Sequence, residues 1–154
     1  MTENFRKTLI IGCGNPFMGN DGAGIYAIER IKEMMPHVEI LDGGTGGLGL
    51  IGEMEGYSRI IIIDAMLGIG EKKGDIKIFY DTPPCIPSTM SLHDAGISEV
   101  IEVAKEIIPG IEIITIGIEA DFVSEYSREI DPEIIEGVKE VCTVLADLLN
   151  ENKK

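Results

Sequence analysis

The feature that most constrains the fold is a run of four consecutive isoleucines, Ile60–Ile63, inside the segment 59–64. Strands that are buried on both faces have continuous apolar runs, whereas strands with one wet face alternate. Similar runs occupy 7–13 and 111–118, and a shorter run occupies 38–41. Apolar residues recur at helical spacing between these runs. The chain is therefore predicted to alternate strands with helices, an order typical of a mostly parallel sheet.

The helices are predicted from apolar spacing and from the residues that begin and end them. Asp94 and Asp131 can act as N-caps, and Pro132 would then occupy the first helical position. The last helix should bury one apolar stripe, made of Ile135, Val138, Val141, Cys142, Leu145 and Leu149. The predicted helices cover about 21–35, 50–55, 94–108 and 132–149.

The connection between 65 and 74 is too short and too rich in glycine for a crossover helix. Segment 76–80 is therefore predicted to be an antiparallel edge strand. We predict one α/β domain over residues 1–154, which is long enough for a single core. Its fold should be doubly wound, with a mostly parallel five-stranded sheet and helices on both faces.

The formal net charge of −14 disfavours nucleic acid and acidic membrane surfaces as partners. No apolar run reaches the roughly 20 residues that a membrane-spanning helix needs. The polar stretch 1–7 does not have the character of a signal peptide. Cys13, Cys85 and Cys142 fit neither a disulfide framework nor a zinc ribbon. We expect a cytoplasmic protein.

The glycine-rich loop after the first strand does not match a nucleotide-binding motif. Gly12-Cys13-Gly14 is followed by Phe17 where a dinucleotide fingerprint needs its third glycine. Asn20-Asp21 stands where a phosphate-binding loop needs lysine and serine or threonine. A carboxylate at a helix start also occupies the place that a phosphate would take. Asp21 alone could simply cap the helix.

Polar residues gather where the predicted strands end. Asn15 and Asp21 follow the first strand, and Asp42 and Asp64 end the second and third. His93 lies in the segment that returns toward the same edge, where open α/β sheets bind ligands. Two carboxylates and one imidazole suit Ni, Zn or Fe and leave coordination positions open. Each residue also has an ordinary structural explanation as a cap, turn or surface residue, so spacing alone leaves both interpretations open.

Other catalytic signatures are absent from the sequence. It contains no G-x-S-x-G elbow and no H-E-x-x-H helix. Cys13 is expected to be buried, and a nucleophilic role for it would need a base that the sequence does not offer nearby. His37 is expected at the surface.

Four stretches of the chain carry a recognisable set of motifs: 12–24, 41–47, 63–65 and 91–96. In this order they resemble the motifs of the [NiFe]-hydrogenase maturation endopeptidases, and the resemblance extends to the fifth strand and the last helix. The resemblance implies an enzyme that removes the C-terminal extension of a hydrogenase large-subunit precursor after nickel insertion. That precursor would be its partner, and we expect the enzyme itself to be a monomer.

The resemblance also implies roles for individual residues. Asp21, Asp64 and His93 correspond to the metal-binding and catalytic residues of that family. The metal would be the nickel of the precursor, and other divalent metals could occupy the site in isolation. Many members have two adjacent acidic residues, but here Asn20 precedes Asp21, so only Asp21 is assigned to the metal. The residues expected near the extended tail are Asn15, Asp42, Gly43, Gly44 and Thr45.

Two alternatives remain open at this point. A non-catalytic nickel-binding or hydrogenase-assembly chaperone module could use the same ligands, as could a general metal-dependent hydrolase of small amides. The sequence leaves open whether the attack involves a metal-polarised carbonyl, a metal-bound water or another group.

Overall fold

The computed structural model describes residues 7–83, 96–121 and 126–151, and its centre is a five-stranded sheet. The strand order is β2-β1-β3-β5-β4, with four parallel strands and β4 antiparallel to β5. The strands are β1 (Thr8–Cys13), β2 (Glu39–Gly44), β3 (Arg59–Met66), β4 (Ile76–Phe79) and β5 (Glu112–Glu119). The predicted fold class and the antiparallel edge strand are confirmed.

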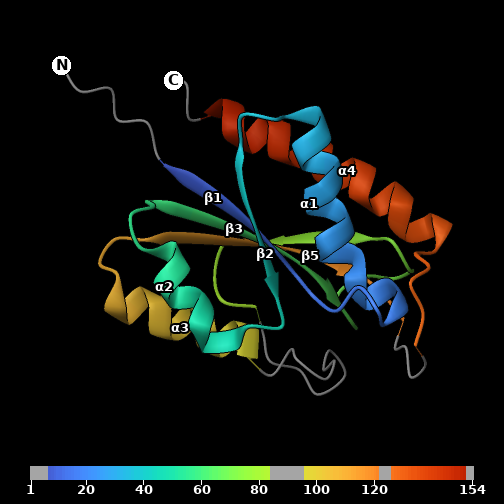
Figure 1. The fold of residues 1–154 in the computed structure, drawn as a ribbon, viewed down its shortest axis with the longest axis horizontal. Coiled ribbons are helices and arrows are strands. Elements are labelled where there is room, and N and C mark those ends of the chain that lie inside the picture. Colours follow the sequence, from blue (N-terminus) through green and yellow to red (C-terminus); the bar gives the residue numbers. More distant parts are fainter. Residues whose placement is uncertain (1–6, 84–95, 122–125, 152–154) are drawn as a thin grey trace.

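Helices cover both faces of the sheet (Figure 1). On one face lie α1 (Ala23–Met34) and α4 (Pro132–Glu151), which contact each other. On the other lie α2 (Leu50–Met54) and α3 (Ile97–Ile107). Two short 3-10 turns, η1 (Gly19–Gly22) and η2 (Gly47–Gly49), precede α1 and α2. None of the described helices is both long and apolar enough to cross a membrane.

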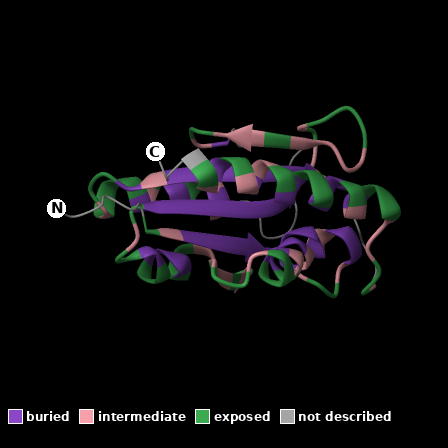
Figure 2. Cartoon of the chain, turned by 90° about the horizontal axis from the view of Figure 1, so that it is seen from above, coloured by how far each residue is buried: buried purple, intermediate pink, exposed green. Residues whose placement is uncertain are grey.

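The isoleucine run supplies both halves of the core. Ile61 and Ile63 pack with α1 and α4, whereas Ile60 and Ile62 pack with α2 and α3. Successive side chains of a strand point to opposite faces, so a strand covered on both sides must be apolar throughout. All four are completely buried, and Figure 2 shows the central strands buried between the helical layers. Each such side chain stabilises the fold by about 1.5–3 kcal/mol.

Two strands extend further than predicted. β2 continues to Gly44 because a bulge lets Gly44 pair with Cys13. β3 continues to Met66 because β5 offers pairing partners as far as Glu119. Asp42 and Asp64 therefore lie inside their strands, and the prediction that they end them was wrong.

The first helix begins later than predicted, since Asp21 lies in η1 and α1 starts at Ala23. Cys13 and Cys142 are buried and His37 is exposed, as expected. Cys85, His93 and Asp94 lie outside the described residues.

The last helix begins at Pro132 directly after Asp131, as predicted. Its buried stripe differs at both ends, because α4 packs against α1 as well as β5. Ile134 and Leu148 are buried, whereas Ile135 and Leu149 are only half-buried.

Candidate active site

The loop after β1 folds tightly around Asp21. The backbone N–H of Asn15 donates a hydrogen bond to Asp21 Oδ2 at 3.0 Å. Gly14 has a φ of 130°, and a Cβ at that position would overlap the carbonyl oxygen of Asp21. Only glycine adopts this backbone conformation easily and leaves room for the approach. The Gly14 N–H also donates to the Gly44 carbonyl at 2.9 Å, which joins this loop to the end of β2.

The start of α1 is pressed onto the sheet beside β3. A Cβ on Gly24 would overlap the carbonyl oxygens of Cys13 and Ile63, so only a glycine fits between the two strands and the helix. η1 packs against β3 as well. The structure therefore brings the elements that carry Asp21 and Asp64 into contact at the carboxyl edge of the sheet, as the sequence predicted.

Asp64 is completely buried within β3, opposite Gly117 of β5. Strand alternation places it on the same face as Ile60 and Ile62, the face that α2 and α3 cover. Burying a carboxylate among apolar residues is costly unless its surroundings compensate. Buried ionisable groups of this kind are concentrated at functional sites. Asp64 is thus not the exposed rim residue that its predicted place at a strand end implied.

The end of β2 forms a glycine-rich turn at the same edge. Asp42 is exposed, and its Oδ1 accepts a hydrogen bond from the Gly44 N–H at 2.9 Å. The Gly43 carbonyl accepts one from the Gly46 N–H at 3.0 Å. A small cavity opens beneath this turn, lined by Cys13, Gly44, Thr45, Gly46, Gly47, Leu50, Gly96 and Ile97. Gly96, at the start of α3, therefore lies at this edge as well.

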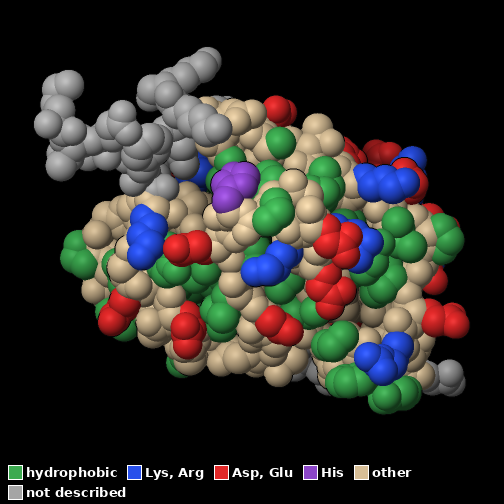
Figure 3. Space-filling model, turned by 45° about the horizontal axis from the view of Figure 1, so that its top comes forward, with side chains coloured by type: hydrophobic (Ala, Val, Ile, Leu, Met, Phe, Trp, Pro, Cys, Tyr) green, Lys and Arg blue, Asp and Glu red, His purple; other side chains and the backbone are tan. Residues whose placement is uncertain are grey.

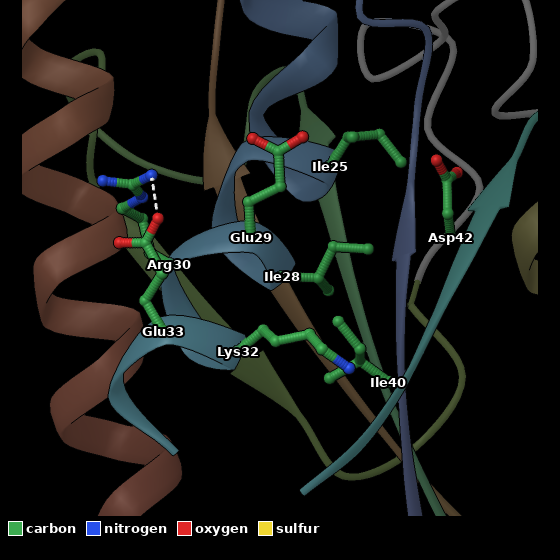
Figure 4. Close-up of a pocket in the computed structure, with 8 residues that line it drawn as sticks. All are labelled: Ile25, Ile28, Glu29, Arg30, Lys32, Glu33, Ile40 and Asp42. Atoms are coloured by element: carbon green, nitrogen blue, oxygen red, sulfur yellow. Dashed lines mark hydrogen bonds and ion pairs between the residues drawn. The ribbon is translucent and has the colours of Figure 1, made fainter. Parts of the chain in front are cut away.

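A larger hollow of about 480 Å³ lies between α1 and β2. Figure 4 shows Ile25, Ile28 and Lys32 on the side of α1 that faces β2, with Asp42 across the hollow. Arg30 instead pairs with Glu33 at 2.7 Å, on the side of α1 nearer α4. The hollow thus runs beside an edge strand and reaches the candidate site at Asp42.

Asn20, which precedes Asp21, is buried and bonded to the residue before α4. It is 4% exposed and forms two hydrogen bonds with Asp131. Its Nδ2 donates to Asp131 Oδ2 at 2.8 Å, and its Oδ1 accepts from the Asp131 N–H at 2.9 Å. Asn20 therefore ties η1 to the start of α4. Sequence reasoning missed this role because the partners are 111 residues apart, and no local pattern marks such a pair.

Lys73, in the β3–β4 connection, also bonds to Asp131. Its Nζ contacts the carboxylates of Asp131 at 2.8 Å, Asp121 at 3.0 Å and Glu133 at 3.3 Å. Hydrogen bonds from Lys73 and then Asn20 hold the pKa of Asp131 below its ordinary value. The three carboxylates raise the pKa of Lys73, with hydrogen bonding to Asp131 the largest cause. The network joins η1, the β3–β4 connection and α4.

Within the described ranges, no three His, Cys, Asp or Glu side chains are grouped so that they could hold a metal. Of the predicted trio, Asp21 and Asp64 are described and His93 is not. Carboxylates suit a first-row divalent metal, although two of them do not complete a site.

The surface charge does not favour a polyanionic partner. Figure 3 shows Lys and Arg side chains interspersed with Asp and Glu on one face, without a continuous basic patch there. The net charge of −14 is consistent with this view. A surface of net negative charge repels polyanions.

The fold defines an α/β protein that carries Asp21 and Asp64 on contacting elements at the carboxyl edge of its sheet. The family model for hydrogenase maturation protease matches residues 25–148. The chain belongs to this family.

Individual relatives agree with this assignment. The chain is 30% identical over 104 residues to the hydrogenase 2 maturation protease of Escherichia coli, covering 64% of this chain and 63% of that protein. It is 30% identical over 148 residues to the hydrogenase expression/formation protein HoxM of Cupriavidus necator, covering 90% and 72%. The chain spans less than two thirds of the length of several curated relatives that it matches.

A solved structure matches nearly the whole chain. The [NiFe] hydrogenase maturation protease HybD from Thermococcus kodakarensis superposes with a TM-score of 0.78 at 27% identity. The match covers 93% of this chain and 99% of that one.

Proposed function

We propose that this chain is an endopeptidase that removes the C-terminal extension of a [NiFe]-hydrogenase large-subunit precursor after nickel insertion. One observation carries the proposal. The fully buried Asp64 lies on a strand that η1, the turn with Asp21, packs against. A costly buried carboxylate at the ligand-binding edge of an α/β sheet is expected to have a functional role.

In this proposal the nickel belongs to the substrate. Asp21, Asp64 and His93 contact the nickel already held by the precursor, and other divalent metals can occupy the site in the isolated protein. A precursor without nickel lacks the atom that joins the two proteins. It therefore binds weakly, and the enzyme acts as a check on complete assembly.

The tail of the precursor is proposed to lie along the turn after β2. Asn15, Asp42, Gly43, Gly44 and Thr45 are the residues assigned to it. Asp42 and Thr45 are exposed, and the glycines permit close approach of a second backbone. Asp42 also lines the hollow between α1 and β2, so we place the incoming tail on that side of the turn. We propose a cytoplasmic monomer as the working form of the enzyme.

The test compares cleavage of the nickel-loaded precursor by variants of the three proposed contact residues. Asp21→Asn, Asp64→Asn and His93→Ala should each lower kcat/KM by about a hundredfold or more, because each removes a contact to the reacting centre. His37→Ala and Asp147→Asn are matched controls at exposed positions and should cleave normally. Circular dichroism must show that the variants are folded.

Two results would contradict the proposal. Folded variants that all cleave at the wild-type rate would remove the three residues from the site. A wild-type protein that binds the loaded precursor tightly but leaves it intact would instead be a hydrogenase-assembly chaperone.

A further inference from the structure

The loop that leads to Asp21 is joined to the segment that precedes α4. The Ser127 N–H donates to the Phe17 carbonyl at 2.8 Å, and the Gly19 N–H donates to the Ser127 carbonyl at 2.7 Å. Met18 and Ser127 form a parallel bridge between these bonds. The two segments therefore lie side by side, although they are more than 100 residues apart in the chain.

This junction brings Phe17, Tyr126 and Arg128 together as an aromatic platform. The rings of Phe17 and Tyr126 are stacked, with centroids 5.7 Å apart and planes inclined by 15°. The guanidinium carbon of Arg128 lies 5.1 Å from the centre of the Phe17 ring. The rings are nevertheless 43% and 74% exposed. The platform is thus an ordered but uncovered set of large side chains.

Its aromatic composition sets the platform apart. The sequence has only four phenylalanines, four tyrosines and no tryptophan. Two of these few aromatic residues are therefore stacked and exposed at one place. Among the other exposed large apolar side chains, Met34 and Ile107 lie at the C-terminal ends of α1 and α3, toward the opposite edge of the sheet. Leu48 is exposed in η2, at the same edge as the candidate site. Aromatic residues and arginine are enriched among the residues that contribute most to protein interfaces.

The platform is directly continuous with the candidate active site. The Met18 carbonyl accepts a hydrogen bond from the Asp21 N–H at 3.2 Å, one residue beyond Phe17. Phe17 of the platform therefore lies in the same loop as Asp21, a few residues away along the chain.

We propose that Phe17, Tyr126 and Arg128 form a docking surface for the folded large-subunit precursor, next to the point where its metal meets Asp21. The inference rests on the proposed function and adds where the partner's protein surface is held. The partner is expected to place an apolar side chain on the rings and a carboxylate near Arg128.

The small size of the platform favours this occupant over a second copy of the chain. A large aromatic side chain buries about 150–250 Å² when fully covered. Two partly exposed rings therefore offer far less than the roughly 1,200 Å² that a stable complex needs. Two copies with a charge of −14 each would also repel one another. A partner that is already attached through its metal needs only such an additional contact.

The test measures KM and kcat for cleavage of the nickel-loaded precursor. Tyr126→Ala should raise KM about tenfold and leave kcat unchanged, because binding is lost and chemistry is not. Tyr126→Phe retains the ring and should behave as wild type. Tyr80→Ala is the matched control, since Tyr80 is 63% exposed and follows β4, which runs away from the carboxyl edge.

The outcomes separate this inference from the proposed function. If the wild type cleaves and Tyr126→Ala has an unchanged KM, docking at the platform is wrong while the protease stands. A loss in kcat alone would show that the platform only holds the Asp21 loop, and would also overturn the inference.

If the wild type does not cleave, binding to the loaded precursor is measured by sedimentation. Docking at the platform is then supported only if Tyr126→Ala binds the precursor about tenfold more weakly than the wild type. A dimer of the protein alone that Tyr126→Ala abolishes would contradict it.

Discussion

Glycines at three backbone contacts determine how close the residues of the candidate site can lie. A Cβ on Gly12 would overlap the Gly24 carbonyl oxygen, and one on Gly24 would overlap the carbonyl oxygens of Cys13 and Ile63. The helix that follows Asp21 can therefore sit directly on the strands that lead to the site. The geometry of the site therefore depends on the absence of a side chain at these glycines as much as on the acidic residues.

Gly24→Ala should lower the free energy of unfolding by about 2–3 kcal/mol, because the methyl group forces α1 away from β1 and β3. Gly52→Ala is the control, since nothing lies within 4 Å of a Cβ there. That exposed helical position should gain up to about 1 kcal/mol from the better helix former. Urea unfolding of both variants measures the difference. If Gly24→Ala and Gly52→Ala had the same free energy of unfolding, α1 would not be packed this closely against β1 and β3 at Gly24.

The sequence predicted the positions of some site residues but not their environments. The placement of Asp21 and Asp64 at one edge of the sheet was predicted from the parallel strands that the apolar runs indicate, and η1 and β3 are indeed in contact. The complete burial of Asp64 could not be predicted, because it depends on how elements distant in the chain pack around β3. Asn20 was interpreted as a missing acid, whereas it bonds to Asp131 across the molecule.

At the scale of elements, the start of α4 is joined to η1 and to the β3–β4 connection through Asp131. Its carboxylate accepts hydrogen bonds from both Asn20 and Lys73. This arrangement positions the turn that carries Asp21 from the opposite end of the chain. The short connection before β4 was enough to predict an antiparallel edge, but its attachment to α4 involves side chains that no periodicity reveals.

The depressed pKa of Asp131 has a consequence for stability on the acid side. A carboxyl group with a lowered folded-state pKa stabilises the protein above its unfolded value of 3.8, and this contribution is lost as the pH falls further. Asp131→Asn should therefore lower stability at pH 7, by about 1 kcal/mol or less because the side chain is partly exposed. It should also reduce the fall in stability between pH 7 and acid pH.

Urea titrations at several pH values measure this effect. Glu136→Gln, which removes an exposed ion pair with Lys139, is the matched control and should change the curve less. If the free energy of unfolding of Asp131→Asn changed with pH in the same way as that of the wild type, the charge of Asp131 would not contribute to stability.

At the scale of the whole molecule, the carboxyl edge of the sheet holds the turn with Asp21, the buried Asp64, the glycine turn after β2 and the aromatic platform. The fold class was predictable because buried parallel strands leave continuous apolar runs. The arrangement of surfaces around the site was not, because it depends on loops that meet only in three dimensions. The proposed enzyme joins its partner through a metal, a tail and a docking surface along this one edge.

The central claim is that cleavage depends on nickel in the substrate. The most direct measurement incubates the protein with the same large-subunit precursor, either nickel-loaded or nickel-free, and follows the mass of the precursor by mass spectrometry. We expect loss of a C-terminal peptide from the loaded form only. Equal cleavage of both forms would contradict recognition through the metal, and an intact loaded precursor would contradict the protease itself.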